Sequence, residues 1–185
     1  MEPLAERLAD GEDEAFQSLY DWCGRRLYRF LVARTGSPDL AADALQETFL
    51  RAVRFRERLR EVTNLQAWMF TVARREADRL LTRSSRSPRG GLADTEGIQA
   101  FAMGDQSRVD DRDELETALA GLTPAEREIL DLHIYGGLTF RETAEVTETP
   151  PGTVATRYRG AIAKLRRRLG VVLVSKTEPA KETKP

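Results

Sequence analysis

The residues best suited to binding chemistry lie in the last third of the chain, where cationic and hydroxyl side chains alternate. Between Gly152 and Gly170 the sequence holds six Lys or Arg residues and no acidic residue. Cations at this density can neutralise the phosphates of a nucleic acid, and short hydroxyl side chains can approach base edges. The composition of this segment therefore favours nucleic-acid binding.

The periodicity of the same segment predicts a helix that presents these side chains on one face. The apolar face would comprise Val154, Tyr158, Ala161, Ile162, Leu165 and Leu169. The opposite face would carry Thr153, Thr156, Arg157, Arg159, Gly160, Lys164 and Arg167. A short helix precedes it across a Pro-Pro-Gly turn, which is typical of a helix-turn-helix DNA-binding motif. A merely solvated basic face, or a calmodulin-like or membrane-surface helix, would have a similar charge pattern.

The composition limits the other functions that the chain could have. Its only cysteine, Cys23, and its only histidine, His133, exclude an internal disulfide and a zinc site built from Cys and His. We find no phosphate-cradling glycine loop and no nucleophile beside a base, so we expect neither an enzyme nor a cofactor or metal. With no apolar run near about 20 residues and no leader at Met1, we expect a cytoplasmic protein without membrane insertion.

The net charge of −1 conceals a strong alternation along the chain. Residues 51–91 carry eleven basic and four acidic groups, whereas residues 92–131 carry three and eleven. Together with the basic segment 152–170, this pattern indicates two contact points on a polyanion, separated by a stretch that the polyanion would repel.

Apolar periodicity predicts several further helices. We expect them at residues 14–35, 39–55, 65–82, 111–120 and 124–135. Ser37 is the predicted N-cap of the second, with Pro38 at its first position. Thr123 and Thr139 should each form a capping box with the glutamate three residues on. Thr149 is a candidate N-cap for the last helix.

Two segments lack this periodicity. Residues 84–110 contain five Gly or Pro and predict a flexible linker, and residues 171–185 predict a disordered tail. The expected fold is therefore all-α. A helical bundle at residues 1–83 would be joined by the linker to a helix-turn-helix module at residues 111–170.

Four short motifs occur in the order found in one known family. They are DALQETFL at residues 43–50, WMFTVARR at 68–75, LTPAER at 122–127 and GTVATR at 152–157. They are similar to the D-x-x-Q-E-T-F-L, W-L-x-x-I-A-R-N, L-P-x-x-x-R and G-T-V-K-S-R signatures of bacterial σ70-family sigma factors. The chain resembles the compact extracytoplasmic-function group, which keeps only the second and fourth conserved regions.

The resemblance implies a function in transcription initiation and three sets of site residues. Contacts with core RNA polymerase would come from Asp43, Gln46, Glu47, Phe49 and Leu50. The promoter −10 element would meet Trp68, Arg74, Arg75 and Arg79. The −35 element would meet Arg141, Thr153, Ala155, Thr156, Arg157, Arg159 and Lys164. The family also implies an anti-sigma factor as a partner, and His133 would be a surface or polymerase-contact residue.

Several positions depart from the family pattern. Arg75 stands where the family often has Asn, and Ala155 replaces a usual Lys and so removes one possible DNA contact. Thr143, Thr147 and Thr149 replace aliphatic residues, and Glu148 replaces a turn glycine. We expect looser packing of the second module, because Thr buries less apolar surface than Ile or Leu.

Two readings of some residues remain open from the sequence. Phe49 and Leu50 could be core residues, and Trp68 could be core rather than a base-stacking platform. A different class of protein is also possible. A helix-turn-helix regulator with an N-terminal dimerisation or sensing module would bind DNA without polymerase.

Overall fold

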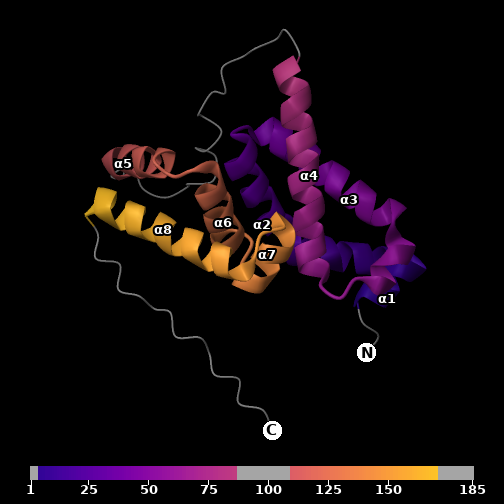
Figure 1. The fold of residues 1–185 in the computed structure, drawn as a ribbon. Coiled ribbons are helices and arrows are strands. Elements are labelled where there is room, and N and C mark those ends of the chain that lie inside the picture. Colours follow the sequence, from indigo (N-terminus) through magenta and orange to yellow (C-terminus); the bar gives the residue numbers. More distant parts are fainter. Residues whose placement is uncertain (1–3, 87–108, 171–185) are drawn as a thin grey trace.

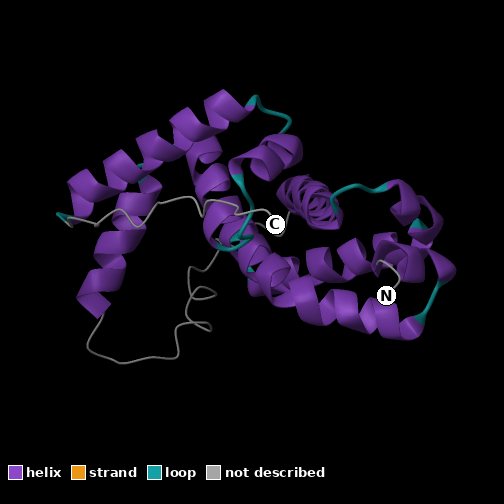
Figure 2. Ribbon diagram, turned by 90° about the horizontal axis from the view of Figure 1, so that it is seen from below, coloured by secondary structure: helices purple, strands orange, loops and turns teal. Residues whose placement is uncertain are grey.

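The protein is helical throughout the part of the chain that its computed structural model describes, residues 4–86 and 109–170 (Figure 2). The N-terminal module comprises α1 Leu4–Asp10, α2 Asp13–Thr35, α3 Pro38–Arg54, the 3₁₀ helix η1 Arg56–Glu61 and α4 Leu65–Arg86. The C-terminal module comprises α5 Val109–Ala120, α6 Pro124–Ile134, α7 Phe140–Thr147 and α8 Pro151–Leu169. Figure 1 shows the two modules side by side, with α6 and α7 between α8 and the first module. The all-α prediction with two modules is confirmed.

The predicted caps explain where three of the helices begin, α3, α6 and α7. Ser37 Oγ accepts a hydrogen bond from the Leu40 amide at 3.3 Å and Pro38 opens α3. Gly36, at φ 67°, closes α2 by donating its amide to the Val32 carbonyl. Both predicted capping boxes form, at the starts of α6 and α7. These local signals fix the helix ends independently of tertiary packing.

The prediction for the start of α8 is wrong. Its N-cap is Pro150, which provides no side-chain cap, and Thr149 Oγ1 instead donates to the Thr147 carbonyl at 3.1 Å. Thr149 therefore closes the turn after α7 rather than opening α8. The predicted linker at residues 84–110 is also too long at both ends, because α4 continues to Arg86 and α5 begins at Val109. Residues 87–108 and the predicted disordered tail at 171–185 lie outside the described residues.

Two elements were not predicted at all. Helix α1 and the 3₁₀ helix η1 pack against one another, and each buries a leucine completely, Leu8 and Leu59. Each is only six or seven residues long, so neither repeats an apolar stripe that sequence periodicity could detect.

One apolar core extends through both modules. It contains the buried residues of α2 to α4, including Phe30 and Phe70, whose rings meet edge to face at 5.5 Å. Leu132, Leu138 and Val146 of the C-terminal module belong to the same cluster. Two smaller clusters hold α5, α6 and α8 together and fix α7 against α8. The first module therefore completes its core with side chains from the second.

Thr143 is one of the positions at which the sequence predicts looser packing of the second module. Thr143 is fully buried in α7, and its hydroxyl oxygen has no hydrogen-bond partner among the described residues. Thr147 Oγ1 donates to the Thr143 carbonyl at 2.7 Å, so that hydroxyl is satisfied. Burying an unpaired hydroxyl is unfavourable, so position 143 carries a cost that an aliphatic residue would not.

Candidate nucleic-acid interface and docking groove

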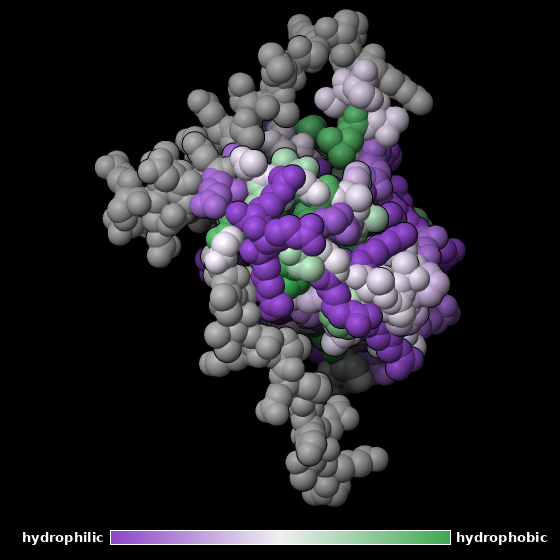
Figure 3. All heavy atoms as spheres, turned by 60° about the vertical axis from the view of Figure 1, so that its left-hand side comes forward, coloured by the Kyte–Doolittle hydropathy of each residue, from purple (hydrophilic) through white to green (hydrophobic). Residues whose placement is uncertain are grey.

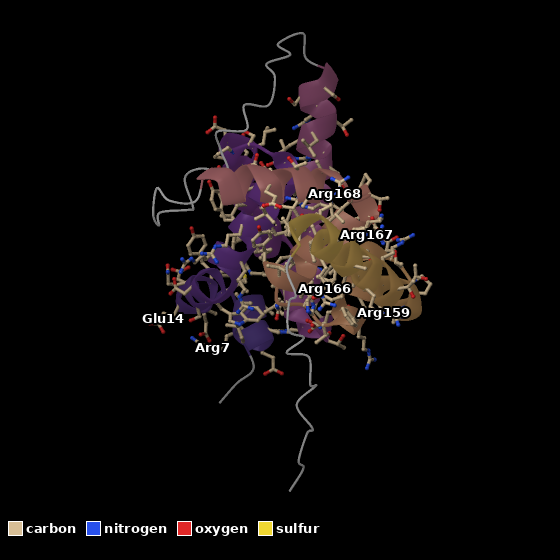
Figure 4. The ribbon with its side chains drawn as sticks, turned by 90° about the vertical axis from the view of Figure 1, so that its left-hand side faces the viewer. Arg7, Glu14, Arg159, Arg166, Arg167 and Arg168 are labelled. Carbon is tan, nitrogen blue, oxygen red and sulfur yellow. The ribbon has the colours of Figure 1, made fainter. Side chains whose placement is uncertain are left out.

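The C-terminal helix α8 turns its apolar stripe inward, as predicted. Val154, Ala161 and Leu165 are buried against α6 and α7. Arginines follow the outer side of the helix, and Figure 4 labels Arg159, Arg166, Arg167 and Arg168 along it. Figure 3, which brings α5 and α8 forward, shows long hydrophilic side chains across this face with hydrophobic patches between them. The helix thus presents a basic surface to solvent.

The residues predicted to read the −35 element lie mostly on this outer surface. Thr156, Arg157 and Arg159 are exposed, whereas Thr153 and Ala155 are half-buried. Arg159 is held along the helix, because its Nη2 donates to Thr156 Oγ1 at 3.4 Å. Arg141 extends from α7 with 89% of its side chain exposed. Each of these positions is open to a partner at the front of the helix-turn-helix.

Lys164 is placed differently from the rest of that set. Its Nζ donates to both carboxylate oxygens of Glu126 on α6, at 2.8 and 2.6 Å. This hydrogen bond is the largest cause that lowers the pKa of the Glu126 carboxyl. Lys164 therefore ties α8 to α6, a contact between residues 38 positions apart that the sequence did not indicate.

His133, predicted to be a surface or polymerase-contact residue, lies partly at the surface and partly in a packed ring cluster. It is half-buried, and its Nδ1 lies 2.8 Å from the Leu138 carbonyl oxygen. Its ring packs against Phe140 and Tyr158, with centroids 5.3 and 4.8 Å away. The histidine holds the loop between α6 and α7 against α8, which positions the helix-turn-helix.

The residues predicted to meet the −10 element lie on α4, and their cationic members are paired with carboxylates. Arg74 Nε donates to Glu128 Oε1 at 2.7 Å, and Arg75 Nη2 donates to Glu148 Oε1 at 3.1 Å. Arg79 Nε lies 3.1 Å from Glu76 Oε2. The sequence alone did not indicate these three acids as neighbours of the arginines.

The position of Trp68 fits in part each of its two interpretations, a core residue and a base-stacking platform. Its side chain is half-buried on α4 and packs against the main apolar core. The core contact supports the structural interpretation, while the remaining exposure leaves one part of the ring accessible. Its placement alone does not make it a stacking platform.

An apolar groove of about 1000 Å³ runs between α2 and α3. Three members of the predicted polymerase set line it, namely Gln46, Phe49 and Leu50. From α2, Phe16 and Tyr20 form the facing wall, and the Tyr20 and Phe49 rings lie 5.2 Å apart. Tyr20 is 50% exposed and Leu50 39% exposed, so apolar side chains from both helices are open to solvent in the groove.

The other two members of that set lie outside the groove. Asp43 is exposed on α3 but does not line it. Glu47 Oε2 lies instead 3.9 Å from Arg79 Nη2 on α4, while Glu76 contacts both Arg79 and Arg51. The structure therefore separates Glu47 from Gln46, and links it to the predicted −10 set through a chain of ion pairs.

The carboxyl group of Asp131 in α6 is buried, and we therefore expect the free energy of unfolding to depend on pH. Burial raises the pKa of its carboxyl to about 6; Arg127 and Arg34 oppose that rise, while Glu128 adds to it. The unfolded pKa is about 4, so between these values the folded state keeps a proton that the unfolded chain has lost. The free energy of unfolding should therefore fall as pH rises from about 4 to about 6.

Replacing Asp131 with asparagine should remove this part of the pH dependence. Urea denaturation at several pH values between 4 and 7 measures it. The variant Asp43→Asn, which changes an exposed carboxylate, should keep the wild-type profile. An unchanged profile in Asp131→Asn would contradict the assignment.

The side chains of the described ranges limit the chemistry that the protein can carry out. No group of three or more His, Cys, Asp or Glu side chains could hold a metal ion there. Nor is any described helix long and apolar enough to cross a membrane. Cys23 is buried, and burial raises the pKa of its thiol to about 12, which keeps it protonated and unreactive.

Comparison with known proteins places both modules. Residues 19–87 match the family model described as Sigma-70 region 2, and residues 112–165 match Sigma-70, region 4. The chain is 31% identical to RNA polymerase sigma factor CarQ of Myxococcus xanthus, over 89% of this chain and 95% of that protein. It is 29% identical to the extracytoplasmic-function (ECF) RNA polymerase sigma factor SigK of Mycobacterium ulcerans, over 88% and 90%.

Solved structures share the fold at lower identity. CnrH, determined with the cytosolic domain of CnrY, superposes with a TM-score of 0.65 at 21% identity, covering 90% of this chain and 95% of that one. RpoE of Bartonella quintana, determined with the anti-sigma factor NepR, gives 0.65 at 22% identity, covering 86% and 99%.

Proposed function

The chain belongs to the σ70 family of RNA polymerase sigma factors, in the extracytoplasmic-function group, and from that membership we propose which of its surfaces perform each step. A sigma factor binds core RNA polymerase, directs it to a promoter and supports initiation, without covalent chemistry of its own. The regulator alternative has no support, because a DNA-binding regulator would not need the region 2 match at residues 19–87.

The groove between α2 and α3 is the proposed polymerase-docking surface, and its exposed apolar lining is the main support for the proposal. Exposed apolar side chains beside an amide and peripheral carboxylates suit a helix of a larger partner. Gln46, Phe49 and Leu50 face the groove, and Asp13 and Asp21 lie among its lining residues. Asp43 and Glu47 would contribute from outside it.

The test compares capture of core RNA polymerase by the wild-type chain and by Gln46→Ala and Glu47→Ala variants. Loss of capture by Gln46→Ala supports the groove. Glu47→Ala has a second effect, because it also removes the partner of Arg79. Capture of core polymerase by every variant at the wild-type level would reject the docking surface.

The promoter contacts are proposed on the two basic helices. Helix α8, with Arg141 of α7, would enter the major groove at the −35 element, where Thr153, Ala155 and Thr156 approach bases and the arginines contact phosphate or guanine. Helix α4 would hold the melted −10 strand through Trp68, Arg74, Arg75 and Arg79. The exposed basic face of α8 supports the first assignment.

Replacing Arg157 with alanine should weaken promoter binding. If Arg157 contacts a base, discrimination at one −35 position should fall by about 1–3 kcal/mol, because a bidentate arginine contact is lost. Binding to a set of single-base promoter variants measures this. Equal loss on every sequence would instead identify Arg157 as a phosphate contact, and no loss would remove it from the interface.

Three further features belong to the proposal. We propose that the two functional domains are the segments that end with α4 at Arg86 and begin with α5 at Val109, joined through residues 87–108. An anti-sigma factor is the proposed regulatory partner, in line with the complexes of CnrH and RpoE. The sigma factor itself would act in the cytoplasm, where polymerase and the chromosome meet. Co-purification from the native host with and without the inducing condition tests for the regulatory partner.

A further inference from the structure

The face of α4 that carries the proposed −10 arginines is covered in part by the chain itself, with the Arg74 side chain 25% exposed and the Arg75 side chain 65% exposed. Helix α7 packs on α4, while α6 packs on α2 and reaches α4 through the side chain of Glu128. Glu128 of α6 accepts hydrogen bonds from Arg74 Nε at 2.7 Å and from Arg34 Nη1 at 2.5 Å. Two cations of the first module therefore converge on one carboxylate of the second.

These charges are largely shielded from water. The side chains of Glu128, Arg34 and Arg74 are 14%, 19% and 25% exposed. Arg34 also donates to Asp78 Oδ1 at 2.6 Å, so the cluster holds two arginines and two carboxylates. Breaking a shielded pair by removing one partner is costlier than breaking a surface pair. The cluster can thus hold the modules in one arrangement.

Polar and apolar contacts continue from the charged cluster along the interface. Asn64 Nδ2 donates to Glu142 Oε1 at 2.9 Å, and Gln66 Nε2 donates to the Gly136 carbonyl at 2.8 Å. A Cβ at position 136 would clash with the Leu132 carbonyl oxygen and lie 3.2 Å from the Phe70 ring, so the turn before α7 accepts only glycine there and brings its backbone close to α4. The two modules are therefore packed, with matched donors and acceptors, beyond their charge attraction.

The second carboxylate in the interface occupies an unfavourable backbone conformation. Glu148 ends α7 at φ 52° and is the only described non-glycine residue at positive φ. This left-handed conformation costs about 1–2 kcal/mol for a residue with a Cβ. Glycine would avoid that cost, but glycine could not place a carboxylate 3.1 Å from Arg75. Glu148 thus adds a carboxylate to this turn at the expense of backbone strain, and that carboxylate pairs with Arg75.

We propose that α6 and α7 are an intramolecular occupant of the −10 face, in which Glu128 and Glu148 take the positions of DNA phosphates on Arg74 and Arg75. The inference rests on the proposed −10 assignment and goes beyond it. In this closed state the −10 strand and the C-terminal module compete for the same arginines. The outer face of α8 stays exposed, so the −35 contacts are available before the −10 contacts are. Separation of the modules is then a required step before the promoter strand can be held.

The test uses the full chain with Glu128→Gln and Glu148→Gln combined, which keeps side-chain shape and removes both negative charges. Binding of a fluorescein-labelled, mixed-sequence single-stranded DNA 12-mer is followed by anisotropy, and module separation by small-angle X-ray scattering. We expect about tenfold tighter binding and a larger radius of gyration, as for a shift in a two-state equilibrium. Adding Arg74→Gln and Arg75→Gln to this variant should abolish the gain.

A matched control separates the local effect from net charge. The variant Glu57→Gln with Glu114→Gln loses the same two charges at exposed positions of η1 and α5, and should bind the 12-mer like wild type. An equal gain in the control overturns the proposal. So does a double variant whose radius of gyration and DNA affinity both stay unchanged. A radius that increases without tighter DNA binding overturns the competition and places the failure in the −10 assignment itself.

Discussion

Replacing Leu50 with aspartate is expected to weaken the binding of core RNA polymerase by at least about tenfold, the loss typical of an interface hot spot. Leu50 lines the apolar groove between α2 and α3 beside Val53, and both are partly exposed in the free chain. A carboxylate there would have to be desolvated against an apolar partner surface, which is strongly unfavourable. Because Leu50 is not part of the buried core, the helices themselves should stay folded.

The affinity is measured by competition for a fixed amount of core polymerase, and far-ultraviolet circular dichroism verifies the fold. Leu115→Asp is the matched control, since Leu115 is 42% exposed on α5, outside the groove, against 39% for Leu50. The control should compete like wild type. If Leu50→Asp does so as well, the groove is not where polymerase docks.

Replacing Phe30 with alanine should lower the free energy of unfolding by about 3–5 kcal/mol, the range for truncating a buried phenylalanine. Phe30 has no exposed surface and packs edge to face on Phe70 in the core that both modules share. The cavity would lie between α2 and α4, which form the frame of the first module. Neighbouring helices cannot close on it without disturbing contacts on the other side.

Urea denaturation followed by circular dichroism measures the loss. Trp22→Ala on the same helix removes a larger side chain that is 39% exposed. It should cost clearly less than Phe30→Ala, because solvent can fill the space that the truncated Trp22 side chain leaves, so no closed cavity forms. Comparable losses in the two variants would mean that the described core is not the main source of stability.

The parts of the fold that could be predicted are those whose causes lie within a few residues. The stripe of α2 repeats through five turns, and Ser37, Thr123 and Thr139 each satisfy amides only two or three residues ahead. Such signals need no tertiary information. The inward face of α8 was predicted for the same reason, since Val154, Ala161 and Leu165 recur at helical spacing.

The parts that could not be predicted depend on residues distant in sequence. The sequence predicts that Arg74 is a cation available on a basic helix. In the structure it pairs with Glu128, which lies 54 positions further along the chain. The sequence predicts that Lys164 contacts DNA, but its Nζ donates to Glu126 on another helix. Charge counts show that acidic and basic blocks alternate, but they do not show which members meet.

Placing site residues on the three-dimensional structure also divided sets that the sequence had grouped. Gln46 and Glu47 are adjacent in one motif, yet Gln46 faces the groove and Glu47 approaches Arg79. Successive helical residues are about 100° apart, so neighbours in a motif commonly serve different surfaces. A motif match alone therefore does not define a single interface.

The core that both modules share has a consequence for biosynthesis. Synthesis begins at the N-terminus, so α2 to α4 leave the ribosome before Leu132, Leu138 and Val146 have been added to the chain. N-terminal domains usually fold first as units, but here the last side chains of the first module's interior arrive some sixty residues after α4 ends. Until then the nascent chain would present an uncovered apolar surface around Phe70, the kind of surface that chaperones bind.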